Sequence, residues 1–164
     1  MTETRTFRDH GVEVIRQSLE KMLGLTEAVR EGTDIEAVHD IRVASRRLRA
    51  AIDVFGAAFA IPEFRRFLAD VKAITDELGA ARDLDVMIET LEKLANELPE
   101  GERDGLERII DEKRTERRKQ QKDVLRALDR TERRDLPHRF EVIVEACMPV
   151  EIGAAPVTLL TEGV

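Results

Sequence analysis

Residues 38–55 carry the arrangement in this sequence with the clearest chemical meaning. Read as a helix, at about 100° per residue, the segment has an apolar stripe that includes Ile41, Leu48 and Phe55. A second stripe lies beside it and steps by 3, 4 and 3 residues: His39, Arg42, Arg46 and Arg49. Guanidinium groups beside a buried face are partly desolvated, which is unfavourable unless an anion pairs with them. The spacing therefore predicts an anion-binding stripe.

The alternative interpretation of the same segment is a solvated basic face. An ordinary helix would relieve the repulsion between its arginines with carboxylates one turn away. Asp40 is the only carboxylate between Val38 and Ile52, and it lies off the basic stripe. Arg47 stands on the far side of the helix. The scarcity of neutralising residues favours the anion site.

A second stripe of the same geometry follows in a long helix that we expect at residues 62–98. Lys72, Thr75, Gly79 and Arg82 again step by 3, 4 and 3 residues. A glycine inside a helix costs about 1 kcal/mol relative to alanine, so Gly79 needs a reason. Close approach of a neighbouring helix or of a ligand to the backbone is the usual one. Two such stripes on facing helices would line a groove.

A third cationic region lies in the middle of a helix expected from about residue 101 to residue 128. Its two ends hold core-spaced apolar residues, but the core-spaced positions between them are Lys113, Arg117, and Gln120 or Gln121. One interpretation is that this seam faces a water-filled basic groove. The other is that long side chains extend to water at the edge of a bundle.

Two segments of this sequence resemble the signatures of the CHAD domain, an all-helical family named for its histidines. The first runs from Asp34 to Ala50 and the second from Leu78 to Val86; the similarity covers roughly residues 8–146. The resemblance implies a helical bundle whose basic groove binds inorganic polyphosphate. Because the sequence shows no Glu-rich cation-binding segment, Gly-rich phosphate loop or Ser-His-Asp set, we expect no catalysis, cofactor or metal. It places both Lys72 and Arg82 on basic positions.

The expected polyphosphate-binding set combines the three cationic regions: His39, Arg42, Arg46, Arg47, Arg49, Lys72, Arg82, Lys113, Arg114 and Arg117. Arg suits phosphate because its planar guanidinium donates two parallel hydrogen bonds, and Lys adds a mobile point charge. His39 can donate a further hydrogen bond, and a nearby phosphate favours its doubly protonated form. Carboxylates beside an anion are repulsive, so we expect Asp83 and Asp85 to orient arginines, either Arg82 or those of the preceding helix.

Composition limits the classes of protein to consider. The chain has 164 residues, 37% charged and 42% apolar, with a formal net charge of −7 and neither Trp nor Tyr. The acidic balance and the lack of stacking aromatics make nucleic acid an unlikely partner. A single cysteine excludes an intramolecular disulfide, and we see neither a membrane span nor a signal peptide. We expect a cytoplasmic protein, associated with polyphosphate granules where these form.

The pattern of apolar residues predicts an all-α fold. With the arrangement that the resemblance implies, we expect an antiparallel up-and-down four-helix bundle with an additional short C-terminal helix. The expected helices cover residues 8–31, 34–56, 62–98, 101–128 and 131–146, and Pro137 either kinks the last one or lies near its start. Residues 8–146 form one bundle unit, and residues 147–164 form an irregular apolar tail.

The resemblance also carries an expectation about assembly. A complete domain of this family is expected to hold two four-helix units, and this sequence resembles only the first. We therefore expect a two-fold homodimer, in which the apolar residues of the tail dock on the neighbour. The competing expectation is a truncated remnant with little affinity for any ligand.

Two other functions remain as alternatives. His39 and Asp40, with His10 upstream, are similar to the metal-binding pattern of HD-type phosphohydrolases, which are also all-helical. The arginines that follow would oppose a divalent cation there. A helical adaptor for protein or nucleic acid is the other alternative. Parallel titrations with polyphosphate, single-stranded RNA and Mn²⁺ separate these functions.

Overall fold

The computed structural model describes residues 6–32 and 35–147, and all of the regular structure in these ranges is helical. The helices are α1 (Phe7–Leu23), α2 (Thr26–Glu31), α3 (Ile35–Phe55), α4 (Pro62–Glu97), α5 (Asp104–Arg133) and α6 (Leu136–Ala146), with short 3₁₀ turns at Gly56–Ala58 and Glu100–Glu102. The expected all-α class is confirmed for this part of the chain. None of the helices combines the length and apolar character needed to cross a bilayer. The proposed tail lies outside the described residues.

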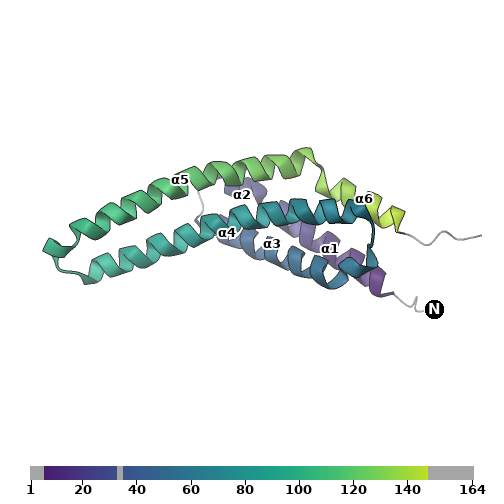
Figure 1. Ribbon diagram of the computed structural model, residues 1–164, viewed down its shortest axis with the longest axis horizontal. Helices are drawn as coiled ribbons and strands as arrows, with labels where there is room; N and C mark the ends of the chain where they lie inside the picture. Colours follow the sequence, from purple (N-terminus) through teal and green to yellow (C-terminus); the bar gives the residue numbers. More distant parts are fainter. Residues whose placement is uncertain (1–5, 33–34, 148–164) are drawn as a thin grey trace, which may run out of the picture.

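Helices α4 and α5 form a long antiparallel hairpin that determines the shape of the molecule (Figure 1). Helix α3 packs against α4, and α1 packs against α3. The tip of the hairpin projects beyond these helices. The described helices therefore do not lie side by side along their full length, as they would in a regular four-helix bundle.

The core lies where α1, α3, α4, α5 and α6 meet. Ile15, Leu48 and Phe67 have no exposed surface, and Phe140 of α6 stacks on Phe67 with ring centroids 5.5 Å apart. Burial of each such side chain contributes about 1.5–3 kcal/mol. This packing holds α3 against α4 and so positions the two basic stripes.

The first expected helix is divided into two. Residues 24 and 25 form a turn, in which the Leu25 N–H donates to Met22 O at 3.2 Å. The Thr26 hydroxyl then donates to Leu23 O at 2.8 Å, which satisfies a carbonyl at the end of α1. Gly32 ends α2 with a φ of 65°, as the sequence predicts, because glycine adopts left-handed backbone without steric cost.

The last two helices also differ from their expected bounds. Helix α5 continues to Arg133, and α6 begins only at Leu136, with Pro137 in its first turn. Asp135 caps α6: its backbone is left-handed (φ 41°), and its side chain accepts from the His138 N–H. Of the two expectations for Pro137, the helix start is confirmed.

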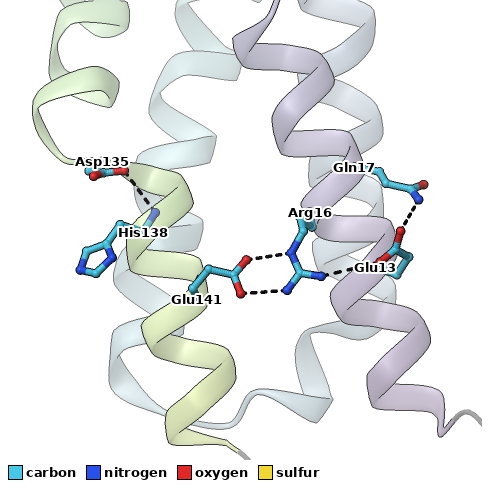
Figure 2. A network of polar contacts seen from close by, with 6 residues as sticks. All are labelled: Glu13, Arg16, Gln17, Asp135, His138 and Glu141. Carbon is cyan, nitrogen blue, oxygen red and sulfur yellow. Dashed lines mark hydrogen bonds and ion pairs between the residues drawn. The ribbon is translucent and has the colours of Figure 1, made fainter.

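Ion pairs hold α6 against its neighbours. Arg16 of α1 donates two hydrogen bonds of 2.8 Å to Glu141 (Figure 2). Asp70 of α4 accepts from both Arg134 and Arg139. Arg16 therefore serves to dock α6.

Candidate functional site

Helix α3 presents its basic residues because its other face is buried as the sequence predicts. All six members of the apolar stripe are at most 8% exposed: Val38, Ile41, Ser45, Leu48, Ile52 and Phe55. His39, Arg42 and Arg49 lie beside this face and are half-buried, whereas Arg46 and Arg47 are exposed. Arg46 and Arg47 line one surface depression with Val43 and Ala50.

Two long ion pairs define the register between α3 and α4. Arg42 lies 3.9 Å from Asp83, and Arg49 lies 3.7 Å from Asp76. The helices are antiparallel, so position 46, between the two arginines, lies opposite position 79, between the two aspartates. We call the surface that carries Arg42, Arg46, Arg49, Lys72, Gly79 and Arg82 the α3–α4 basic surface.

Gly79 leaves open space on this surface. A Cβ atom built at Gly79 would meet no atom within 4 Å, apart from the glycine's chain neighbours and the nearby backbone of its own helix. Close helix packing, one of the two reasons expected for this glycine, is therefore wrong for the described residues. Approach of a ligand to the bare backbone is the expectation that remains.

The cations of α3 and α4 differ in their partners. The carboxylates that face Arg42 and Arg49 have side chains 76% and 61% exposed, so these pairs are long and strongly screened. Within the described ranges, Arg46, Lys72 and Arg82 have neither an ion pair nor a hydrogen bond. Positive charge thus remains available at the centre of the surface.

His39 lies near the N-terminal end of the basic stripe on α3. Its Nδ1 atom is buried and has no hydrogen-bond partner in the described part of the protein. An unsatisfied buried polar atom costs about 1–3 kcal/mol, which a ligand or solvent contact would recover.

The predicted cations of α5 lie apart from the α3–α4 basic surface. Helix α5 packs mainly on α4, and α4 lies between α5 and α3 in Figure 1. Lys113 donates to Glu116 at 2.9 Å, and this hydrogen bond raises the pKa of Lys113. Arg114 donates to Glu92 at 2.7 Å, which raises the pKa of Arg114. In the described structure Lys113 and Arg114 are thus bonded to carboxylates, and their place in a shared basic groove stays a prediction.

The polar seam of α5 is explained by its partners on α4. Arg117 donates to Asp85 at 2.7 Å, and these two side chains are only 16% and 18% exposed. Gln120 donates to the Glu77 carboxylate at 2.8 Å. Asp83 faces an arginine of α3 as expected, whereas the partner of Asp85 is on α5.

A pocket of about 350 Å³ beside the Arg117–Asp85 pair contains two cations that the sequence interpretation missed, Arg30 and Arg118. Arg30 pairs with Asp129 at 2.6 Å and Glu132 at 3.0 Å, so it mainly ties α2 to α5. No spacing pattern marks these residues, because they come from separate helices.

The residues of the metal-binding alternative, His10, His39 and Asp40, do not come together in the described structure. His10 packs edge-on against Phe55, with ring centroids 5.6 Å apart. Phe55 lies 16 residues beyond His39 on α3, which corresponds to about 24 Å. Among the described residues, no group of three His, Cys, Asp or Glu side chains could hold a metal ion.

These features define an all-helical protein with a cation-rich surface between two helices. The family model of the CHAD domain matches residues 13–159, most of the sequence. The chain therefore belongs to the CHAD domain family. Searches of curated proteins and of solved structures gave no match.

Proposed function

We propose that this protein binds inorganic polyphosphate, or a related phosphate polyanion, on the α3–α4 basic surface without catalysing a reaction. The observation that carries the proposal is the open space at Gly79, which lies between Asp76 and Asp83 where these face Arg49 and Arg42. Membership of the CHAD family supports phosphate as the ligand class.

The geometry suits a chain of phosphates better than a single ion. Residues three and four apart on a helix are separated by about 5–6 Å, so successive cations can contact successive phosphates. A ligand would compete with Asp76 and Asp83 for Arg49 and Arg42. Both carboxylates are largely exposed and can turn toward solvent.

Lys113, Arg114 and Arg117 remain predicted ligand contacts, but unlike Arg46 and Lys72 they are already bonded to carboxylates. A phosphate would have to displace a carboxylate bonded at 2.7–2.9 Å from each of them. We therefore place the first phosphates on α3 and α4, with His39 and Arg47 at the margins. In this proposal the four helices of the bundle unit are α1, α3, α4 and α5. We also propose that the protein acts in the cytoplasm, where polyphosphate is present.

Parallel titrations test this function. Polyphosphate, single-stranded RNA of matched charge and Mn²⁺ are each added to the full chain, and heat of binding is recorded. We expect polyphosphate to bind at least tenfold more tightly than RNA, because the chain has no Trp or Tyr to stack on bases. Equal affinity for RNA would indicate a general polyanion site, and binding of Mn²⁺ with no binding of polyphosphate would contradict the proposal.

A further inference from the structure

The pocket beside the Arg117–Asp85 pair combines an apolar wall with arginine side chains. Its volume of about 350 Å³ lies within the usual range of small-molecule sites, about 300–1,000 Å³. Helices α2, α3, α4 and α5 all contribute to its lining. We call the cavity lined by Val29, Val38, Asp85, Arg117, Arg118 and Leu125 the α2–α5 pocket.

The pocket exists because α2 is short and is held to α5 by polar contacts. Among the residues of α2, only Val29 is buried. Gln121 of α5 donates to Val29 O at 3.2 Å, and Arg30 pairs with Asp129 of α5 at 2.6 Å. A six-residue helix fixed in this way leaves space between itself and the rest of the bundle.

Two arginines in this lining have donor atoms that no described residue uses. Arg117 donates through Nε to Asp85 at 2.7 Å and through Nη1 to Gln121 at 2.9 Å, but its Nη2 has no hydrogen-bond partner in the described ranges. Arg118 donates through Nη2 to the Thr115 hydroxyl at 2.7 Å, and its other nitrogens have no described partner. Because two bonds fix the plane of the Arg117 guanidinium, an anionic ligand would meet donors that are already in position.

The charges of the lining favour a ligand with a single negative charge. Three arginines and one carboxylate line the pocket, and Arg30 is already paired. Arg117 and Asp85 are only 16% and 18% exposed, so their charges are weakly screened. Asp85 would repel a second negative charge on the ligand. A single carboxylate can instead pair with a guanidinium through two parallel hydrogen bonds.

The rest of the lining favours an apolar body on the ligand. Val29 and Val38 are 1% and 5% exposed, and Leu125 is partly exposed. A cavity of about 150 Å³ holds one benzene ring, so the α2–α5 pocket has room for about two fused rings. A polyphosphate chain has no apolar part that could pack on this wall.

Helix α4 presents the α2–α5 pocket and the α3–α4 basic surface on different sides. Asp83 and Asp85 are two residues apart, so they project about 200° apart around the helix. Asp83 faces Arg42 of α3, whereas Asp85 bonds to Arg117 of α5. A ligand in the pocket is therefore separate from one on the basic surface.

We propose that the α2–α5 pocket binds a small carboxylic acid, in its ionised form, with an aromatic or branched aliphatic body. The carboxylate contacts Arg117 and Arg118, and the body packs against Val29, Val38 and Leu125. The ligand fills the space under α2 and holds this helix on α5. The inference does not depend on polyphosphate binding.

Naphthoate has the required head and body and serves as the probe. Isothermal titration calorimetry of the full chain, without polyphosphate, compares it with naphthylmethanol, which lacks the charge, and with acetate, which lacks the rings. We expect naphthoate to bind at least tenfold more tightly than either. Arg118→Ala should weaken naphthoate binding about tenfold, the loss of one charged hydrogen bond, and leave the affinity for naphthylmethanol unchanged. Lys119→Ala is the matched control, because this neighbouring cation is exposed and outside the lining.

Nuclear magnetic resonance locates the bound ligand. The backbone amide of Gly32, in the pocket lining, should shift with naphthoate, and that of Gly101, in the turn between α4 and α5, should not. Circular dichroism checks folding of the Arg118→Ala variant, whose only lost hydrogen bond in the described structure is the one to exposed Thr115.

Three outcomes would overturn the proposal. Equal affinity for naphthoate and naphthylmethanol would show that no site for a carboxylate exists. Unchanged naphthoate affinity in Arg118→Ala would place the ligand elsewhere. Displacement of bound naphthoate by polyphosphate would show that the pocket is part of the phosphate site.

Discussion

The cations of α3 and α4 differ in whether they already have a polar partner. Those without one are the better candidates for ligand binding. Arg42 and Arg49 face exposed aspartates at 3.9 and 3.7 Å, whereas Arg46 and Lys72 have no polar partner in the described ranges. An unpaired cation loses no existing bond when an anion arrives. Arg46 and Lys72 are therefore the residues at which the loss of a ligand contact can be measured most directly.

We predict that Arg46→Ala and Lys72→Ala each weaken polyphosphate binding by about 1–3 kcal/mol, the value of a lost charged hydrogen bond. Isothermal titration calorimetry measures the change. Arg133→Ala and Lys122→Ala are the controls, because both side chains are exposed on α5 and away from the surface. Unchanged affinity in both site variants, with folding intact, would remove the α3–α4 site.

Gly79→Ala should separate stability from binding. A Cβ there meets no atom, so the gain in helix propensity should stabilise the fold by about 0.5–1 kcal/mol. The same methyl group would keep phosphate from the backbone and should lower affinity. Thermal unfolding and calorimetry record the two effects. A variant that is more stable and binds equally well would show that the ligand does not approach Gly79.

Gly11→Ala is the control for Gly79→Ala, because the same substitution is made at a glycine that is tightly packed. A Cβ at Gly11 would lie 2.8 Å from the Phe55 ring, so the ring and helix α1 would have to shift. We expect a loss of about 1–3 kcal/mol in the free energy of unfolding, the usual cost of overpacking.

At the scale of elements, α6 is held by charge as well as by Phe140. The hydrogen bonds from Arg16 lower the pKa of Glu141 below its ordinary value of 4.5, and the same bonds raise the pKa of Arg16. The two side chains are 36% and 43% exposed, so solvent screening limits the pair to about 1 kcal/mol or less.

This pair predicts a pH-dependent contribution to stability. Because the pKa of Glu141 is lower in the folded state, the contribution is complete above the unfolded value of 4.5 and is lost as pH falls through the folded value. Glu141→Gln should therefore destabilise the protein at pH 7, and by less at a pH below 4.5, as measured by urea unfolding. Glu145→Gln, an exposed neighbour on α6, should have no effect at either pH. An equal loss at both pH values would contradict the ion-pair explanation.

At the scale of the whole molecule, a local cationic surface operates against a net charge of −7. Helices α4 and α5 neutralise each other's charges along their seam, through pairs such as Arg117–Asp85 at 2.7 Å. The α3–α4 basic surface retains its charge because its carboxylates are distant and exposed. Attraction of a polyanion therefore depends on how the helices are arranged.

Salt dependence measures how many of these cations contact the ligand. By analogy with single-stranded nucleic acid, log affinity should fall linearly with log salt concentration by about 0.7 per phosphate neutralised. Contact with all five cations of α3 and α4 (Arg42, Arg46, Arg49, Lys72 and Arg82) predicts a slope of about −3.5. Participation of the three α5 cations as well predicts about −5.6. An affinity independent of salt would indicate an apolar or metal-bridged site.

Local sequence was sufficient for the helical class, for the buried face of α3 and for the helix end at Gly32. In each case the cause lies within one turn of the chain, an apolar period or a left-handed glycine. For Pro137 the sequence left open a kink or a helix start, and the structure decided for the start. The turn at residues 24 and 25 was not predictable in the same way, because Leu25 continues the apolar period of α1.

Tertiary structure decided which of the predicted cations stay available. Lys113, Arg114 and Arg117 are as close together in the sequence as the cations of α3, but the carboxylates facing Arg114 and Arg117 come from α4, 22 and 32 residues earlier in the chain. Likewise, Gly79 lies opposite Arg46 only because α3 and α4 pack in one register. Helical spacing determines which residues share one face of a helix. Which helix packs against that face is determined by long-range packing.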